Sequence, residues 1–95
     1  METFETYLNE TDVFDEYGDR QEALAELSEG EELQLAELNG KTVVVSANGY
    51  ILGSLREDTL KKLAIAEGKS LRLFALRLVN DCCRYNALVR FVIED

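Results

Sequence analysis

The residues best suited to chemistry form an acidic and aromatic cluster near the N-terminus. Its members are Asp12, Phe14, Asp15, Glu16, Tyr17 and Asp19. Carboxylates at this density attract cations, and the two aromatic rings could anchor apolar contacts inside a charged rim. We therefore expect these six residues to form a partner-binding surface that engages a basic protein. The plainer interpretation is a solvated flank that aids solubility.

Other kinds of chemistry find little support in the sequence. The chain has no histidine, the commonest general base, and no serine-centred hydrolase motif or glycine-rich phosphate loop. The adjacent Cys82 and Cys83 lack the further soft ligands that zinc requires. The acids around Gly18 do not follow the calcium-loop pattern, because Phe14 stands where an oxygen ligand is needed. We expect no enzyme, no metal site and no cofactor.

The charge of the chain is divided unevenly along its length. Residues 1–37 contain thirteen acids and one base, Arg20, whereas residues 38–95 contain six acids and nine bases. The net charge is −9, so the first part carries −12 and the second +3. A division of this kind indicates an interaction surface rather than a requirement of the fold. In a sharper form of the hypothesis the carboxylates mimic DNA phosphates and occupy the groove of a nucleic-acid-binding protein, as small phage-encoded inhibitors do.

Size and hydropathy indicate a single small domain. Ninety-five residues suffice for one modest core. No apolar run approaches the roughly 20 residues that cross a bilayer, and the acidic start does not resemble a signal peptide. We expect a cytoplasmic protein without membrane contact. Within its single domain, residues 1–29 form an acidic segment and residues 30–95 a β-rich module.

Two Asn-Gly pairs, Asn39-Gly40 and Asn48-Gly49, predict the centre of the fold. Asn-Gly favours the two-residue type I′ hairpin turn, and the flanking segments are rich in strand-forming residues. We expect a three-stranded meander over residues 32–38, 41–47 and 50–55, apolar on both faces and hence covered on both sides. The predicted cross-strand pairs are Leu38–Lys41, Ala36–Val43, Leu35–Val44, Ala47–Tyr50, Ser46–Ile51 and Val45–Leu52.

A helix and a long hairpin should follow the meander. Residues 58–67 predict a helix that ends before Gly68, with its apolar stripe on Leu60, Leu63 and Ala64. Residues 69–79 and 85–93 predict the last two strands. We expect the final strand to leave a free edge through which the chain could associate with itself.

The N-terminal segment reads as helical. Asp19-Arg20-Gln21-Glu22 has the form of a capping box that opens a short helix through Leu27. The spacing of four between Phe4 and Leu8, and between Val13 and Tyr17, also suits a helix face. The predicted fold is α+β: a small bent five-stranded antiparallel sheet or partly closed barrel, one helix between strands three and four, and an acidic N-terminal helical segment.

Three segments between Gly30 and Val79 follow one another in the order of a known family. They are an apolar strand at 42–45, a glycine-containing hairpin return at 49–55 and a helix at 60–68. In this order they resemble the HIRAN domain, a small β-rich module of repair and remodelling proteins and of stand-alone bacterial and phage chains. The resemblance implies capture of single-stranded DNA ends. The family's Asn-Pro-Tyr-Asp type of loop is reduced here to Asn39-Gly40, so none of its DNA-contacting residues can be assigned.

Nucleic-acid binding is thus the alternative to a basic protein partner, and it would depend on the basic residues of the C-terminal part. Arg72 and Arg77 have opposite parity along their strand, so they need not share a face. We expect these bases to be scattered, and some to pair with N-terminal acids. The net charge makes direct nucleic-acid binding the weaker hypothesis. The bases are Lys61, Lys62, Lys69, Arg72, Arg77, Arg84 and Arg90.

Overall fold

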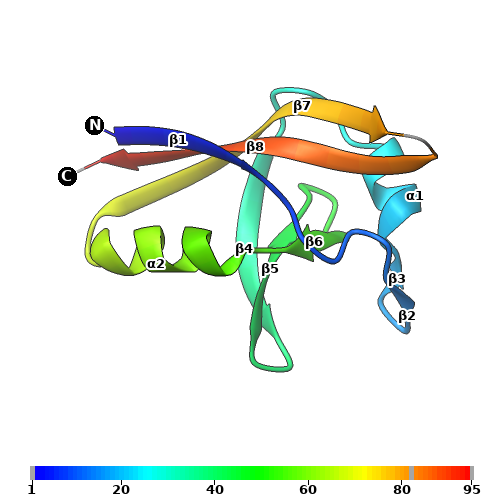
Figure 1. Ribbon diagram of the computed structural model, residues 1–95, viewed down its shortest axis with the longest axis horizontal. Helices are drawn as coiled ribbons and strands as arrows, with labels where there is room; N and C mark the ends of the chain where they lie inside the picture. The colour runs from blue at the N-terminus through cyan, green and yellow to red at the C-terminus, as the bar shows by residue number, and fades with distance from the viewer. Residues whose placement is uncertain (1, 82, 95) are drawn as a thin grey trace.

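The computed structural model describes residues 2–81 and 83–94. Its elements follow one another along the chain as shown in Figure 1. Their order is β1 (Glu2–Tyr7), β2 (Phe14–Asp15), β3 (Gly18–Asp19), α1 (Arg20–Ala25), β4 (Glu32–Leu38), β5 (Lys41–Val45), β6 (Ile51–Ser54), α2 (Glu57–Ile65), β7 (Ser70–Asp81) and β8 (Arg84–Glu94).

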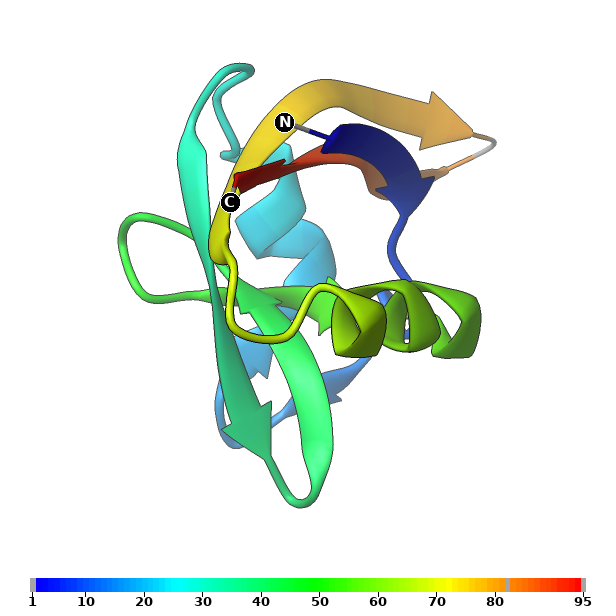
Figure 2. The ribbon, with the colours of Figure 1, turned by 90° about the vertical axis from the view of Figure 1, so that its left-hand side faces the viewer.

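The fold is mostly β and is built on one bent antiparallel sheet. Six strands pair in the order β1-β8-β7-β4-β5-β6, and β2 and β3 form a separate two-stranded hairpin. Figure 2 shows how strongly the sheet bends between its β1-β8-β7 half and its β4-β5-β6 half. Both helices lie on the inner side of the bend, below β1, β8 and β7 (Figure 1). The prediction of a small bent antiparallel sheet is confirmed, but the sheet has six strands instead of five and is not closed.

The sixth strand comes from the segment that we expected to be helical. Glu2–Tyr7 pairs with β8, and Phe4 stacks on Phe91 with 4.9 Å between ring centroids. The prediction of a helix face on Phe4 and Leu8 is therefore wrong, as is that on Val13 and Tyr17, where the chain forms the β2–β3 hairpin. Phe4 and Thr6 face inward in alternation along the strand. A short, highly charged helix would be marginally stable in water, whereas the strand is stabilised by the cross-strand contact of Phe4 with β8.

An isolated bridge links Asn9, which follows β1, to the far edge of the sheet. The N–H and C=O groups of Asn9 and Ser54 exchange hydrogen bonds of 2.9 and 2.8 Å. Gly53 permits this approach, since a Cβ there would lie 2.8 Å from the carbonyl oxygen of Asn9. The two edges of the bent sheet are thereby tied together without closing a barrel.

The predicted meander is present as β4, β5 and β6. The first hairpin has the expected register, including Ala36 opposite Val43 and Leu38 opposite Lys41. The predicted pairs of the second hairpin are wrong, because a bulge between Val44 and Val45 shifts the register and places Val45 opposite Ile51. In the first turn both Asn39 and Gly40 have positive φ, as in a type I′ turn, whereas in the second only Gly49 does. In the second hairpin the N–H of Ser46 donates a hydrogen bond to the carbonyl oxygen of Tyr50, so the loop is one residue longer than predicted and includes Ala47.

Both remaining predicted elements are present with corrected details. Helix α2 starts at Glu57, and its inward face carries Thr59 and Leu63, whereas Leu60 and Ala64 are exposed. The buried face of the helix is therefore rotated relative to the predicted apolar stripe, because the chain enters the helix from buried Leu55 and turns Thr59 inward.

No helix among the described residues is long and apolar enough to cross a membrane.

The long hairpin β7–β8 differs from the prediction in two ways. Strand β8 pairs with β1 on one side and β7 on the other, so it is not an edge strand, and self-association through it loses its premise. A bulge between Ala75 and Arg77 shifts the alternation of β7. Arg72 and Arg77 consequently oppose Val92 and Leu88, which lie on the same, outer face of β8. The bulge thus places both arginines on one face despite their opposite parity in the sequence.

The core draws on the whole chain, including the acidic segment. Leu8, Leu24 and Leu27 join the same buried cluster as Val44, Leu52 and Phe91. On the middle strand of the meander, the adjacent Val43 and Val44 are both buried, which confirms that this strand is covered on both sides. Residues 1–29 are therefore part of the packed body instead of an appendage to a complete module.

Candidate functional site

The predicted acidic and aromatic cluster lies on the β2–β3 hairpin and the start of α1. Phe14 is 79% exposed and Tyr17 50% exposed, so the hairpin presents both rings to solvent. Asp15 stabilises the tight turn, since its Oδ1 accepts a hydrogen bond of 2.9 Å from the N–H of Tyr17. Glu16 is exposed in the same turn. This element holds two aromatic side chains away from the core, which is unusual for residues that bury well elsewhere.

Asp19 connects this hairpin to helix α1. Its side chain caps the helix by accepting a 3.0 Å hydrogen bond from the N–H of Gln21. The cap confirms the predicted helix start, although α1 ends at Ala25 before the expected Leu27. Because the cap fixes where the helix begins, it also fixes the direction in which the following acidic residues project.

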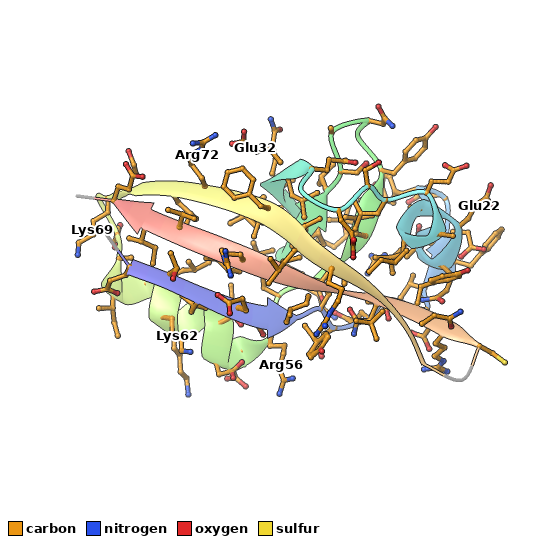
Figure 3. The ribbon with its side chains drawn as sticks, turned by 90° about the horizontal axis from the view of Figure 1, so that it is seen from above. Glu22, Glu32, Arg56, Lys62, Lys69 and Arg72 are labelled. Atoms are coloured by element: carbon orange, nitrogen blue, oxygen red, sulfur yellow. The ribbon has the colours of Figure 1, made fainter. Side chains whose placement is uncertain are left out.

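A pocket of about 260 Å³ opens between the hairpin, α1 and the loop before β6. Tyr17 and Tyr50 contribute its aromatic lining, and Asp19, Glu22 and Glu26 contribute carboxylates. We call these five residues the acidic tyrosine pocket. Tyr50 is 54% exposed, and Glu22 projects outward from α1 (Figure 3). The pocket therefore combines rings and negative charge at one accessible place.

The two glutamates of the pocket have no ion-pair partner among the described residues, although the helix dipole favours Glu22 in the first turn of α1. Glu22 and Glu26 lie four residues apart on α1, where like charges repel, and Glu26 occupies the C-cap, at the negative end of the helix dipole. Among residues 2–81 and 83–94, none forms an ion pair with either of them. Each repulsion costs a few tenths of a kcal/mol or so. A bound cation would relieve this repulsion.

The structure separates the six predicted site residues. Tyr17 and Asp19 line the acidic tyrosine pocket, while Phe14 and Glu16 lie exposed on the hairpin beside it. Asp15 lines a different pocket. Asp12 lines neither of these two pockets and forms a 3.2 Å ion pair with Arg84 of β8.

Three residues of the pocket were absent from the predicted site. Glu22 and Glu26 could have been found, because their spacing on a capped helix places them on one face next to Asp19. Tyr50 could not, because its contact with this region depends on how the meander folds back across the chain.

Several N-terminal acids pair with C-terminal bases, as predicted. Besides the pair of Asp12 with Arg84, Glu5 lies 3.2 Å from Arg90, and Glu32 lies 3.2 Å from Arg72. The acid Glu10 binds Lys41 at 2.8 Å and accepts a 2.6 Å hydrogen bond from the Ser54 hydroxyl. These pairs account for part of the uneven charge and leave Glu22 and Glu26 among the unpaired remainder.

Metal chemistry gains no candidate from the described residues. No group of three or more potential ligands is gathered there in a way that could hold a metal ion. Cys83 is an exposed free thiol, and its neighbour Cys82 lies outside the described residues.

Comparison with known proteins found no similar protein: no protein-family model, no curated protein and no solved structure matches the chain.

Proposed function

We propose that the chain is a non-enzymatic binding module that captures a basic side chain of a protein partner in the acidic tyrosine pocket. The observation that carries this proposal is the convergence of Tyr17 and Tyr50 with unpaired Glu22 and Glu26 around one opening. An arginine or lysine held against a tyrosine ring gains a cation–π attraction of about 0.5–2 kcal/mol, depending on its desolvation. The carboxylates add charge-assisted hydrogen bonds.

A protein is favoured over a small cation because of the neighbouring hairpin. Phe14 offers an exposed apolar ring next to the charged rim, and interfaces often place such a ring against an apolar residue of the partner. The net charge of −9 would speed the approach of a basic surface. The DNA-binding groove of a nucleic-acid-binding protein is one surface with this chemistry.

The nucleic-acid alternative receives less support. Arg72, Arg84 and Arg90, three of the bases that it would need, already form ion pairs with acids of the chain. A nucleic-acid strand presents several phosphates, so each arginine that it used would have to leave its acid, and these small costs would add up along the strand.

The proposal is tested with a fluorescent oligo-arginine peptide, whose binding is followed by anisotropy at low ionic strength. The double variant Glu22→Gln/Glu26→Gln should weaken binding by about tenfold, since it removes the charges that face the pocket. The matched control is Glu37→Gln/Glu67→Gln, which removes two exposed acids elsewhere and should change affinity by less than about twofold. Equal losses in both variants would show that net charge alone attracts the peptide.

The aromatic part of the pocket has its own test. Replacing Tyr50 by leucine removes the ring face and should weaken peptide binding about threefold, whereas Tyr50→Phe should retain most of the affinity. Unchanged binding by Tyr50→Leu would contradict a role for cation–π contact. Because Tyr50 is exposed, neither change should unfold the domain.

A further inference from the structure

A second and larger pocket lies at the junction of β1, the β6–α2 connection and the β7–β8 hairpin. Its volume is about 690 Å³, within the usual range for small-molecule sites. Tyr7 and Tyr85 line it with aromatic rings, and Arg56 and Arg84 line it with guanidinium groups. We call these four residues the arginine–tyrosine pocket. It shares no lining residue with the acidic tyrosine pocket.

The chemistry of this pocket is opposite to that of the molecule as a whole. Asparagine and threonine side chains complete its polar lining, and none of the lining residues within the described part of the chain is acidic. The protein nevertheless carries 19 acids against 10 bases. No described acid lines the pocket itself and two arginines do, so the pocket is suited to an anion even though Asp58 and Asp12 pair with these arginines.

The two arginines can be recruited by a ligand. Arg56 lies 3.6 Å from Asp58, and Arg84 lies 3.2 Å from Asp12, and both guanidinium side chains are substantially exposed. Exposed ion pairs of this kind contribute about 0–1 kcal/mol, so an incoming phosphate could replace them at little cost. Figure 3 shows Arg56 beside the end of β1. Arg84 reaches the same pocket from the first residue of β8.

The walls of the pocket are held rigidly. The Asn86 side chain accepts a 3.2 Å hydrogen bond from the N–H of Leu8 and donates one of 3.1 Å to its carbonyl oxygen. The Gln21 side chain clamps the backbone of Tyr85 in the same two-sided way, at 2.6 and 3.0 Å. These bonds fix the end of β1 and the start of β8 before a ligand arrives, which lowers the entropic cost of binding.

We propose that the arginine–tyrosine pocket binds a small anion that carries a planar ring, of the nucleoside monophosphate class. The phosphate contacts Arg56 and Arg84, whose guanidinium forks match phosphate geometry. The base stacks on a tyrosine ring, and the exposed amide of Asn80 is available to its edge. This site goes beyond the proposed capture of a basic protein and does not depend on it.

The inference is tested by calorimetric titration of the full chain with AMP, adenosine and inorganic phosphate. AMP should bind saturably with one site, and both adenosine and phosphate should bind at least about tenfold more weakly, since each lacks one half of the recognised chemistry. Adenosine binding as well as AMP would overturn the role of the arginines. Phosphate binding as well as AMP would overturn the role of the ring.

Matched variants separate a built site from general charge. Arg56→Gln/Arg84→Gln should weaken AMP binding by about tenfold or more, whereas Arg72→Gln/Arg90→Gln, which removes two ion-paired arginines outside the pocket, should leave it within about twofold. Equal effects of the two variants, or no AMP binding by the wild type, would refute the proposal. If a short single-stranded oligonucleotide binds more tightly than AMP, the ligand of the pocket is a nucleic acid, and the proposal of a free nucleotide is overturned.

Discussion

Glu10 is an acid that the fold holds through an ion pair with Lys41 and a hydrogen bond from Ser54. It adopts a left-handed backbone conformation, with φ of 53°, directly after the bridge between Asn9 and Ser54. This conformation costs a non-glycine residue about 1–3 kcal/mol, so it is found where surrounding contacts hold the residue in place. The hydrogen bonds from Lys41 and then from Ser54 lower the pKa of Glu10 below its ordinary value of 4.5.

A lowered pKa in the folded state makes stability depend on pH in one direction. The unfolded chain binds the proton more readily, so the charged form of Glu10 stabilises the fold above pH 4.5, and this contribution is lost as the pH falls through the lower folded value. Glu10→Gln should therefore lower the free energy of unfolding at pH 7. The difference in the free energy of unfolding between this variant and the wild type should shrink below pH 4.5. Urea unfolding at pH 7 and at a pH below 4.5 measures this difference.

Glu37→Gln is the control for this comparison, because it removes one exposed charge that forms no ion pair among the described residues. It corrects for the relief of repulsion on a chain of net charge −9. A deficit of Glu10→Gln that persists unchanged at low pH would mean that the pair with Lys41 contributes nothing.

At the level of elements, the two Asn-Gly turns show how much one dipeptide can predict. Asn39 has a φ of 52°, whereas Asn48 is not among the residues with positive φ. Asn39→Ala should therefore lower the free energy of unfolding by about 1 kcal/mol, since alanine resists the left-handed region. Asn48→Ala should change it by less than about 0.5 kcal/mol. Urea unfolding of the two variants checks this, and equal losses would contradict the assignment of different turns.

The same contrast explains which elements the sequence could predict. The β4–β5 hairpin depends on local turn chemistry, so its register follows from Asn39-Gly40 alone. The bulge between Val44 and Val45 accompanies the full burial of Leu52, and that burial is a property of the assembled core. Strand β1 could not be predicted, because the pairing that makes it a strand comes from β8, more than eighty residues away. The acidic tyrosine pocket was found only in part for the same reason, since Tyr50 reaches it through the fold of the meander.

Over the whole molecule, the N-terminal third contributes charge and core at once. Leu8, Leu24 and Leu27 belong to the buried cluster, while acids from the same third lie exposed around them. The uneven charge of the sequence therefore does not mark a separable domain. Apolar residues of this third hold the fold together, and its unpaired acids are free to serve a partner.

This division of roles predicts opposite effects from two variants of the same third. Leu24→Ala removes a fully buried side chain and should lower the free energy of unfolding by about 2–5 kcal/mol. Replacing Glu2, Glu16, Glu22 and Glu26 by glutamine raises the net charge from −9 to −5 and should leave the melting temperature equal or higher, because repulsion falls. Thermal unfolding followed by circular dichroism measures both.

The fourfold variant also tests whether stability and binding are separable in this molecule. Its fold should survive while its affinity for the oligo-arginine peptide falls, because the two charges that face the acidic tyrosine pocket are among the four removed. If the variant instead unfolds, the acids serve the structure itself, and uncompensated charge on α1 ceases to be an argument for a partner. If it folds and binds the peptide as tightly as before, the capture site lies elsewhere on the chain.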